Sequence, residues 1–218
     1  VSQDEVTGDC YGLNHLSFFS NVKLKGQDIM PRLLEDDEVY QKTDMRFFEK
    51  DLAKHLGCIL NEYLYYFYYR EMALENILKA GITRGEVIRD VNRGMTEELS
   101  HMDIDHDFDN CLRVFEKWYG MRENAYMANE TGIKTGKPPF SFDIYEKDSG
   151  GYAGVALKYM YSELSGQESE MILCVPNQGA IPGLRDTDVV EITCTIRDGK
   201  YIPHKIDEPG ELQMELIR

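Results

Sequence analysis

Two kinds of side chain in this sequence could carry chemistry: a histidine near the N-terminus and a cluster of tyrosines farther along the chain. The stretch CYGLNHLSFFSNVKLKGQDI, residues 10–29, places His15 in an apolar run. Residues 10–25 are rich in β-branched and aromatic side chains and predict a strand or a hairpin. An imidazole can bind a divalent metal or transfer a proton, but a lone histidine in such a run is more often a core residue. Both roles stay open for His15.

The tyrosines crowd the stretch EYLYYFYYRE, for which a helical pattern is expected. Neighbouring residues on a helix point in different directions, so these rings cannot all face one core, and some must line a cavity or an interface. A phenol with an ordinary pKa near ~10 acts as a base only when a nearby cation favours the phenolate. The alternative is an oligomer contact or a buried helix. The tyrosines are Tyr63, Tyr65, Tyr66, Tyr68 and Tyr69.

Composition limits the partners. The 218 residues carry a formal net charge of −15, which argues against nucleic acid and against an anionic membrane surface. One or two arginines can still neutralise a small phosphorylated ligand locally. The five cysteines are scattered without a paired motif, so the sequence predicts a reducing cytoplasm, and no stretch approaches the ~18 apolar residues of a membrane span.

The acidic run DIDHDFDN, residues 103–110, has alternating aspartates that resemble the start of a calcium-binding loop. Such a loop needs glycine at its sixth position and glutamate at its twelfth, where Phe108 and Val114 stand. The other interpretation is a solvated loop whose aspartates cap the following helix.

The order of predicted elements indicates an α+β fold, with helices packed on a mainly antiparallel sheet. Gly57 and Gly81 are expected to end helices, and Thr83 with Glu86 predicts a capping box. The Pro-, Gly- and Ser-rich stretch at 134–151 predicts a loop, and the last residues start a helix. No strand is followed by GxGxxG, the glycine turn that binds dinucleotides. Helices are predicted at 28–40, 46–57, 62–81, 83–102, 108–132 and 152–164, and strands at 170–177, 188–199 and 200–206.

Five motifs occur together over nearly the whole chain: GLNHLSF, GQDIMPRLL, ILNEYLYYFYY, TRGEVI and VPNQGAIPGLRDTDVVEITC. In this order and spacing they resemble glycoside hydrolase family 4. The resemblance implies the fold of a lactate or malate dehydrogenase C-terminal domain. It also implies a glycosidase that depends on NAD and a divalent metal, usually Mn²⁺, and works by oxidation at sugar C3, proton abstraction at C2 and elimination.

The resemblance assigns roles to four residues. It implies His15 as a metal ligand, Asn14 as a sugar contact and Tyr63 as the base at C2. Arg84 is similar to an arginine that meets the sugar 6-phosphate, often in a neighbouring subunit's site. The family's second metal ligand, a cysteine upstream of GLNH, has no match, and Cys10 is interpreted as structural.

The family has an N-terminal NAD-binding domain and terminal helices that have no match here. Residues 1–218 are therefore expected to form a single substrate- and metal-side C-terminal domain of a 6-phospho-glucosidase-type enzyme of this family. The isolated domain is expected to be inactive and to hold no cofactor tightly. Ala153 and Gly154 stand where relatives often have Ser-Glu, and no proline precedes the tyrosine motif, which leaves substrate details open. No motif distinguishes an α from a β linkage.

Two other functions are compatible with the sequence. A malate or lactate dehydrogenase relative is disfavoured by the tyrosine stretch and the lack of a catalytic His-Asp pair. A non-catalytic sugar-sensing or oligomerisation module of the same fold is the second alternative. The expected partners are a phosphorylated sugar and further copies of the chain, as a homo-dimer or homo-tetramer, because the aromatic stretch suits a contact between copies.

Overall fold

A computed structural model describes residues 5–133, 139–143 and 151–218. The chain divides into two compact units, and each is described by itself. The sheet unit comprises Val1–Leu64 together with Asp148–Arg218. The helical unit comprises Tyr65–Lys147. The predicted loop at 134–151 lies largely outside the described residues.

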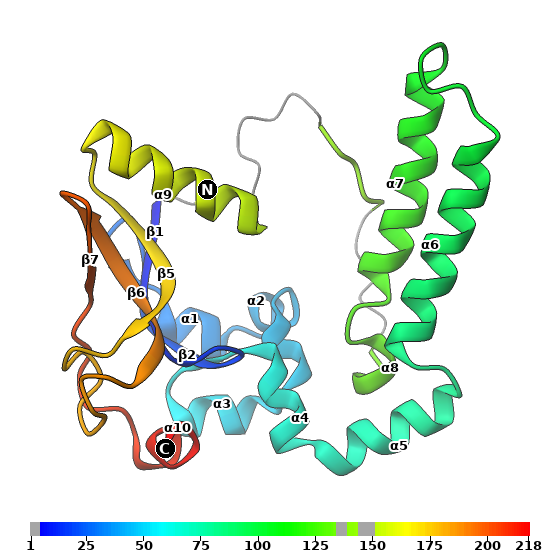
Figure 1. Ribbon diagram of the computed structural model, residues 1–218. Coiled ribbons are helices and arrows are strands. Elements are labelled where there is room, and N and C mark those ends of the chain that lie inside the picture. The colour runs from blue at the N-terminus through cyan, green and yellow to red at the C-terminus, as the bar shows by residue number, and fades with distance from the viewer. Residues whose placement is uncertain (1–4, 134–138, 144–150) are drawn as a thin grey trace. The chain divides into compact units, whose positions relative to one another are not determined.

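The sheet unit is built on one antiparallel sheet (Figure 1). Its main order is β3-β2-β1-β6-β5, while β4 pairs with β2 and β7 pairs with β6. The core of the sheet is apolar: Phe18 and Ile192 are fully buried. The described strands are β1 (Val6–Leu13), β2 (Leu16–Leu24), β3 (Gln27–Asp28), β4 (Ile59–Leu60), β5 (Ser169–Pro176), β6 (Val189–Arg197) and β7 (Lys200–Pro203).

Short helices follow the first strands and the last one, and a longer helix, α9, precedes the last three strands. Asp36 separates the first two helices, because its carboxylate accepts hydrogen bonds from the N–H groups of Glu38 and Val39 and so starts a new helix. The helices of this unit are α1 (Met30–Glu35), α2 (Asp37–Gln41), η2 (Asp44–Phe47), α3 (Lys50–Leu56), η3 (Glu62–Leu64), α9 (Gly151–Ser165) and α10 (Glu211–Ile217).

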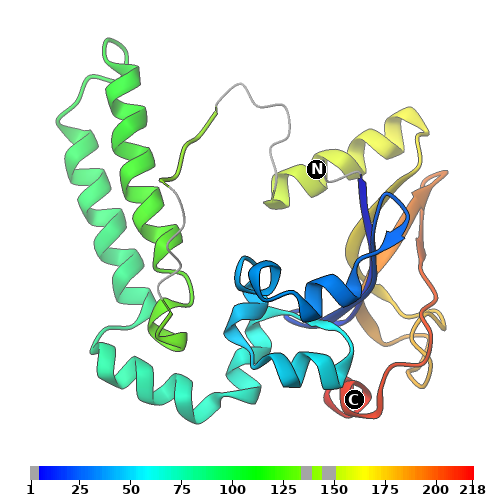
Figure 2. The same cartoon turned by 180° about the vertical axis from the view of Figure 1, so that it is seen from behind.

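In the helical unit the two longest helices, α6 and α7, pack side by side (Figure 1 and Figure 2). Thr83 and Glu86 form the predicted capping box at the start of α6. Asp107 precedes α7, but its side chain makes no capping bond and instead accepts from Asn110. The described helices are α4 (Tyr65–Tyr68), α5 (Arg70–Ala80), α6 (Arg84–Ser100), α7 (Phe108–Asn124) and α8 (Ala128–Thr131).

The structure confirms the predicted fold class, the helix stops at Gly57 and Gly81, the capping box and the three strands after residue 168. The expectation that aspartates cap the helix after residue 107 is wrong, because Asp107 bonds a side chain instead. No helix among the described residues is both long and apolar enough to cross a bilayer.

Four predicted helices are wrong in extent. The helix predicted at 28–40 ends and restarts at Asp36, and that at 46–57 becomes η2 and α3. The helix predicted at 62–81 forms three pieces, η3, α4 and α5. Tyr69 separates α4 from α5, because its backbone leaves the helical region (φ −124°, ψ 35°). The helix at 108–132 breaks at Met127, whose φ of 55° is left-handed. Periodicity misses such single-residue breaks, since apolar spacing continues across them.

Close packing of α6 on α7 depends on Gly94. A Cβ built at Gly94 would lie 2.3 Å from the Trp118 ring. That ring is held in place by a 2.8 Å hydrogen bond from its Nε1 to Glu98. A larger residue at position 94 must therefore displace either the ring or the helix.

We predict that Gly94→Ala lowers the free energy of unfolding of the helical unit by about 1 kcal/mol, since overpacking of about 1–3 kcal/mol exceeds the ~1 kcal/mol gain in helix propensity. Gly85→Ala on the same helix is the control, because its Cβ would meet only Thr83 Oγ1 at 4.0 Å. It should be neutral or stabilising. Urea unfolding followed by fluorescence of Trp118, the single tryptophan, measures both. Equal effects of the two substitutions would contradict the packing argument.

Candidate functional site

His15 lies at the tip of the β1–β2 hairpin. Leu13 pairs with Leu16, so Asn14 and His15 form a two-residue turn in which both side chains are exposed. His15 has a left-handed backbone with φ 65°. The hairpin alternative is therefore confirmed, and the interpretation of His15 as a core histidine is excluded.

Tyr63 lies against this turn, although it is far from His15 in the sequence. The rings of His15 and Tyr63 have centroids 4.6 Å apart at an interplanar angle of 60°. The approach follows from the sheet: β4 pairs with β2 through Phe18 with Leu60, and η3, which carries Tyr63, begins two residues after Leu60. Tyr63 is 36% exposed, so its ring faces both His15 and solvent.

Asn14, His15 and Tyr63 thus gather in one part of the sheet unit. An imidazole and a phenol in contact at the surface can share the binding of one ligand: the imidazole as a donor to a cation, the phenol as a proton acceptor once a cation favours the phenolate. The sequence predicted Asn14 and His15 from one motif and Tyr63 from another, and the sheet brings the two motifs together.

Arg84 belongs to the helical unit, as the first residue of α6. Its Nη1 donates to the carbonyl of Arg122 at 3.0 Å, and its guanidinium lies 5.8 Å from the centroid of the Tyr126 ring. The neighbouring Glu86 carboxylate has a pKa below its usual value because the N–H and hydroxyl of Thr83 donate to it. The first turn of α6 therefore carries the negative charge of Glu86 beside the positive charge of Arg84. Anion binding there would depend on the Arg84 side chain.

A divalent metal fits these residues only in part. His15 supplies one exposed imidazole, a good ligand for a borderline metal such as Mn²⁺ or Zn²⁺. Among the described residues no group of three or more His, Cys, Asp or Glu side chains could hold an ion. His15 therefore fits one position of a metal site whose remaining ligands must come from elsewhere.

Burial disfavours the thiolate form of three of the four buried cysteines. Burial raises the pKa of Cys10 to about 12 and those of Cys58 and Cys194 to about 11. The Cys10 side chain is 99% inaccessible, and its backbone N–H donates to Thr193 at 2.9 Å. A protonated thiol is a poor nucleophile and a poor metal ligand, which agrees with a structural role for Cys10.

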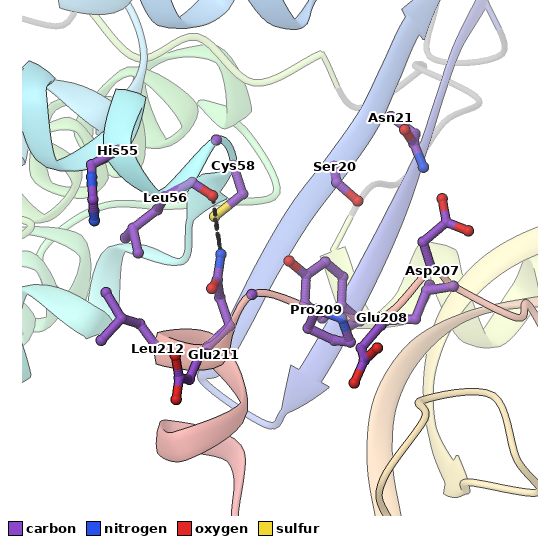
Figure 3. Close-up of a pocket in the computed structure, with 15 residues that line it drawn as sticks. Ser20, Asn21, His55, Leu56, Cys58, Asp207, Glu208, Pro209, Glu211 and Leu212 are labelled. Carbon is purple, nitrogen blue, oxygen red and sulfur yellow. Dashed lines mark hydrogen bonds between the residues drawn. The ribbon is translucent and has the colours of Figure 1, made fainter.

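A hollow of about 450 Å³ lies elsewhere in the sheet unit (Figure 3). It is bounded by the end of α3 and the start of α10, which Gln213 joins by donating to the Leu56 carbonyl at 3.0 Å. Three carboxylates line it, those of Asp207, Glu208 and Glu211. Like charges repel, so this hollow is unsuited to a sugar phosphate. None of the four candidate residues lines it or a smaller hollow of about 270 Å³ beside His204.

Comparison with known proteins identifies the family. Residues 10–218 match the family model described as the Family 4 glycosyl hydrolase C-terminal domain. The chain belongs to this family. It is 24% identical over 232 residues to the maltose-6'-phosphate glucosidase MalH of Clostridium acetobutylicum, covering 99% of this chain and 45% of that protein.

Solved family 4 structures share the fold. The 6-phospho-beta glucosidase from Thermotoga maritima, solved with manganese, NAD⁺ and glucose-6-phosphate, matches with TM-score 0.56 and 20% identity, over 100% of this chain and 43% of that one. A 6-phospho-alpha-glucosidase from gut microorganisms, solved with NAD and glucose-6-phosphate, matches with TM-score 0.54 and 20% identity, over 100% and 45%. The family 4 chain described here thus spans less than half the length of these relatives.

The left-handed backbone at His15 makes asparagine its best replacement, because asparagine tolerates this region better than other non-glycine residues. We predict that His15→Asn leaves the free energy of unfolding unchanged or slightly higher, while His15→Ala lowers it by about 1 kcal/mol. Urea unfolding followed by circular dichroism measures the difference. If the alanine variant were the more stable, the turn geometry would be contradicted.

Proposed function

We propose that this chain is the substrate- and metal-side C-terminal domain of a glycosidase that hydrolyses 6-phosphoglucosides by oxidation at C3, proton abstraction at C2 and elimination of the glycosidic oxygen. The observation that carries the proposal is the contact between His15 and Tyr63, two residues that family resemblance assigns to one reaction. Membership of family 4 supports the reaction class.

Tyr63 is the proposed base. The phenolate oxygen of Tyr63 would accept the C2 proton. Formation of a phenolate requires nearby positive charge, because a phenol otherwise keeps its proton at neutral pH. When bound, NAD⁺ would supply a hydride acceptor for C3 and a divalent cation would supply the charge that acidifies the C2 proton. His15 would hold that cation through its imidazole, within reach of the Tyr63 ring. Asn14, exposed beside His15, would donate to a sugar hydroxyl.

Arg84 is the proposed phosphate contact. A guanidinium offers five N–H donors and keeps its charge when partly buried, so the bond from Arg84 to the Arg122 carbonyl leaves donors for a phosphate. The two glucosidase structures solved with glucose-6-phosphate make a phosphorylated sugar the favoured ligand class. The five cysteines are all free thiols, which supports a reducing compartment such as the cytoplasm.

We predict that the full-length protein with NAD⁺, Mn²⁺ and a reductant releases p-nitrophenol from 6-phosphorylated glucosides. Tyr63→Phe should lower kcat at least 100-fold, the scale of general-base catalysis. His15→Asn should raise the Mn²⁺ concentration needed for half activity, and Arg84→Gln should raise KM for phosphorylated more than for free glucosides. Release that is indifferent to NAD⁺ and to Tyr63→Phe would overturn the proposed mechanism. No release from any glucoside would favour a non-catalytic sugar-sensing or oligomerisation module.

The proposed homo-oligomer has a candidate surface on α9. Leu157, Met160, Tyr161 and Leu164 are each more than half exposed and recur at the i, i+3, i+4, i+7 spacing of one helix face. The helix carries one Lys and one Glu, so it is neutral within a chain of net charge −15. A second copy, which is repelled elsewhere by like charge, can approach this face without that cost.

We predict that Leu164→Glu on α9 converts an oligomer of this chain to monomers in light scattering after size exclusion. Leu78→Glu is the matched control, because Leu78 is 71% exposed but belongs to α5. It should leave the mass unchanged. A wild-type chain that is monomeric at all concentrations, or equal loss of association in the two variants, would contradict the assignment of this face.

A further inference from the structure

The residue that connects the hairpin to Tyr63 is Asn61. Strand β4 ends at Leu60, and the next N–H, that of Asn61, still donates to the Ser17 carbonyl of β2 at 3.0 Å. The Asn61 carbonyl then accepts from the N–H of Leu64 at 3.0 Å, which closes the first turn of η3. The chain thus passes from strand to helix at this one residue.

The side chain of Asn61 bonds to both elements of the candidate site. Its Oδ1 accepts from the N–H of Tyr63 at 3.0 Å, the asparagine turn to the residue two ahead. Its Nδ2 donates to Ser17 Oγ at 3.4 Å. Ser17 is 99% buried and lies two residues after His15 on β2. One amide therefore links the backbone of Tyr63 to the strand that begins directly after His15.

We infer that Asn61 is a positioning residue: its amide fixes the Tyr63 ring against His15. The catalytic meaning of this inference rests on the proposed function, while the geometry stands without it. Asn61 acts through the backbone of Tyr63 and the side chain of Ser17.

The wider fold does not depend on this amide. The pairing of Phe18 with Leu60, and the burial of Leu64 to 2% exposure, hold β4 and the end of η3 in place by backbone bonds and apolar packing. Removing the amide should therefore loosen the orientation of Tyr63 without unfolding the sheet unit. A side chain whose loss changes a ring contact more than stability is a positioning group.

The test uses the 218-residue chain and NMR at one fixed pH. Ring current from Tyr63 shifts the Cε1 proton of His15. His15→Asn identifies that signal among the five histidines, and Tyr63→Leu gives the signal without the ring current. Asn61→Ala should move the signal more than half of the way to the Tyr63→Leu value. Asn61→Asp, whose carboxylate can still accept from the Tyr63 N–H, should keep it near the wild-type value.

Ser17→Ala provides a second route, because it removes the Oγ partner and leaves the turn at Tyr63 intact; a smaller shift in the same direction is expected. The inference would be overturned if the His15 signal of a folded Asn61→Ala chain kept its wild-type position. It would also be overturned if Asn61→Asp moved that signal toward the Tyr63→Leu value as far as Asn61→Ala does. If Asn61→Ala does not fold, Ser17→Ala with an unchanged signal would overturn it. Activity of full-length Tyr63→Phe decides the proposed function separately, since the NMR result requires no catalysis.

Discussion

The pairing of β4 with β2 is the interaction on which the candidate site depends. Strand β4 is only two residues long, yet it joins Leu60 to Phe18, and both side chains are almost fully buried. Burial of such side chains contributes roughly 1.5–3 kcal/mol each, more than any single polar contact nearby. Apolar packing thus fixes where the polypeptide carrying Tyr63 meets the hairpin that carries His15, and the polar side chains only orient the two rings.

The chemistry of the site follows from that placement. His15 and Tyr63 are both accessible, and neither is committed to the core. A surface pair of this kind offers one metal ligand and one potential base, but no enclosure and no complete set of ligands among the described residues. The proposal that the domain works with a further domain of a longer enzyme is consistent with this, because relatives are more than twice as long as the matched region.

The sequence predicted well those features that depend on a few neighbouring residues, such as the starts and ends of helices. The capping box at Thr83 and the glycine stop at Gly81 depend on a few neighbouring residues, so the sequence carries the whole signal. The two-residue turn at His15 was open between strand and hairpin, because a histidine in a left-handed conformation has no propensity signature as strong as glycine's. Asn61 was missed as a site residue. The sequence offered one signal for Asn61: an asparagine that directly follows a strand, two residues before Tyr63, can accept from the Tyr63 N–H. Its second partner, Ser17, is 44 residues away in the sequence, so no local pattern predicts that bond.

The central claim is that Tyr63 removes a proton from sugar C2, and solvent isotope incorporation tests it most directly. A full-length protein hydrolysing a 6-phosphoglucoside in D₂O should give glucose-6-phosphate with deuterium at C2, because the abstracted proton is replaced from solvent, and Tyr63→Phe should abolish that incorporation together with turnover. The account would be contradicted if the wild-type protein formed product that retained protium at C2, or if Tyr63→Phe formed product at the wild-type rate.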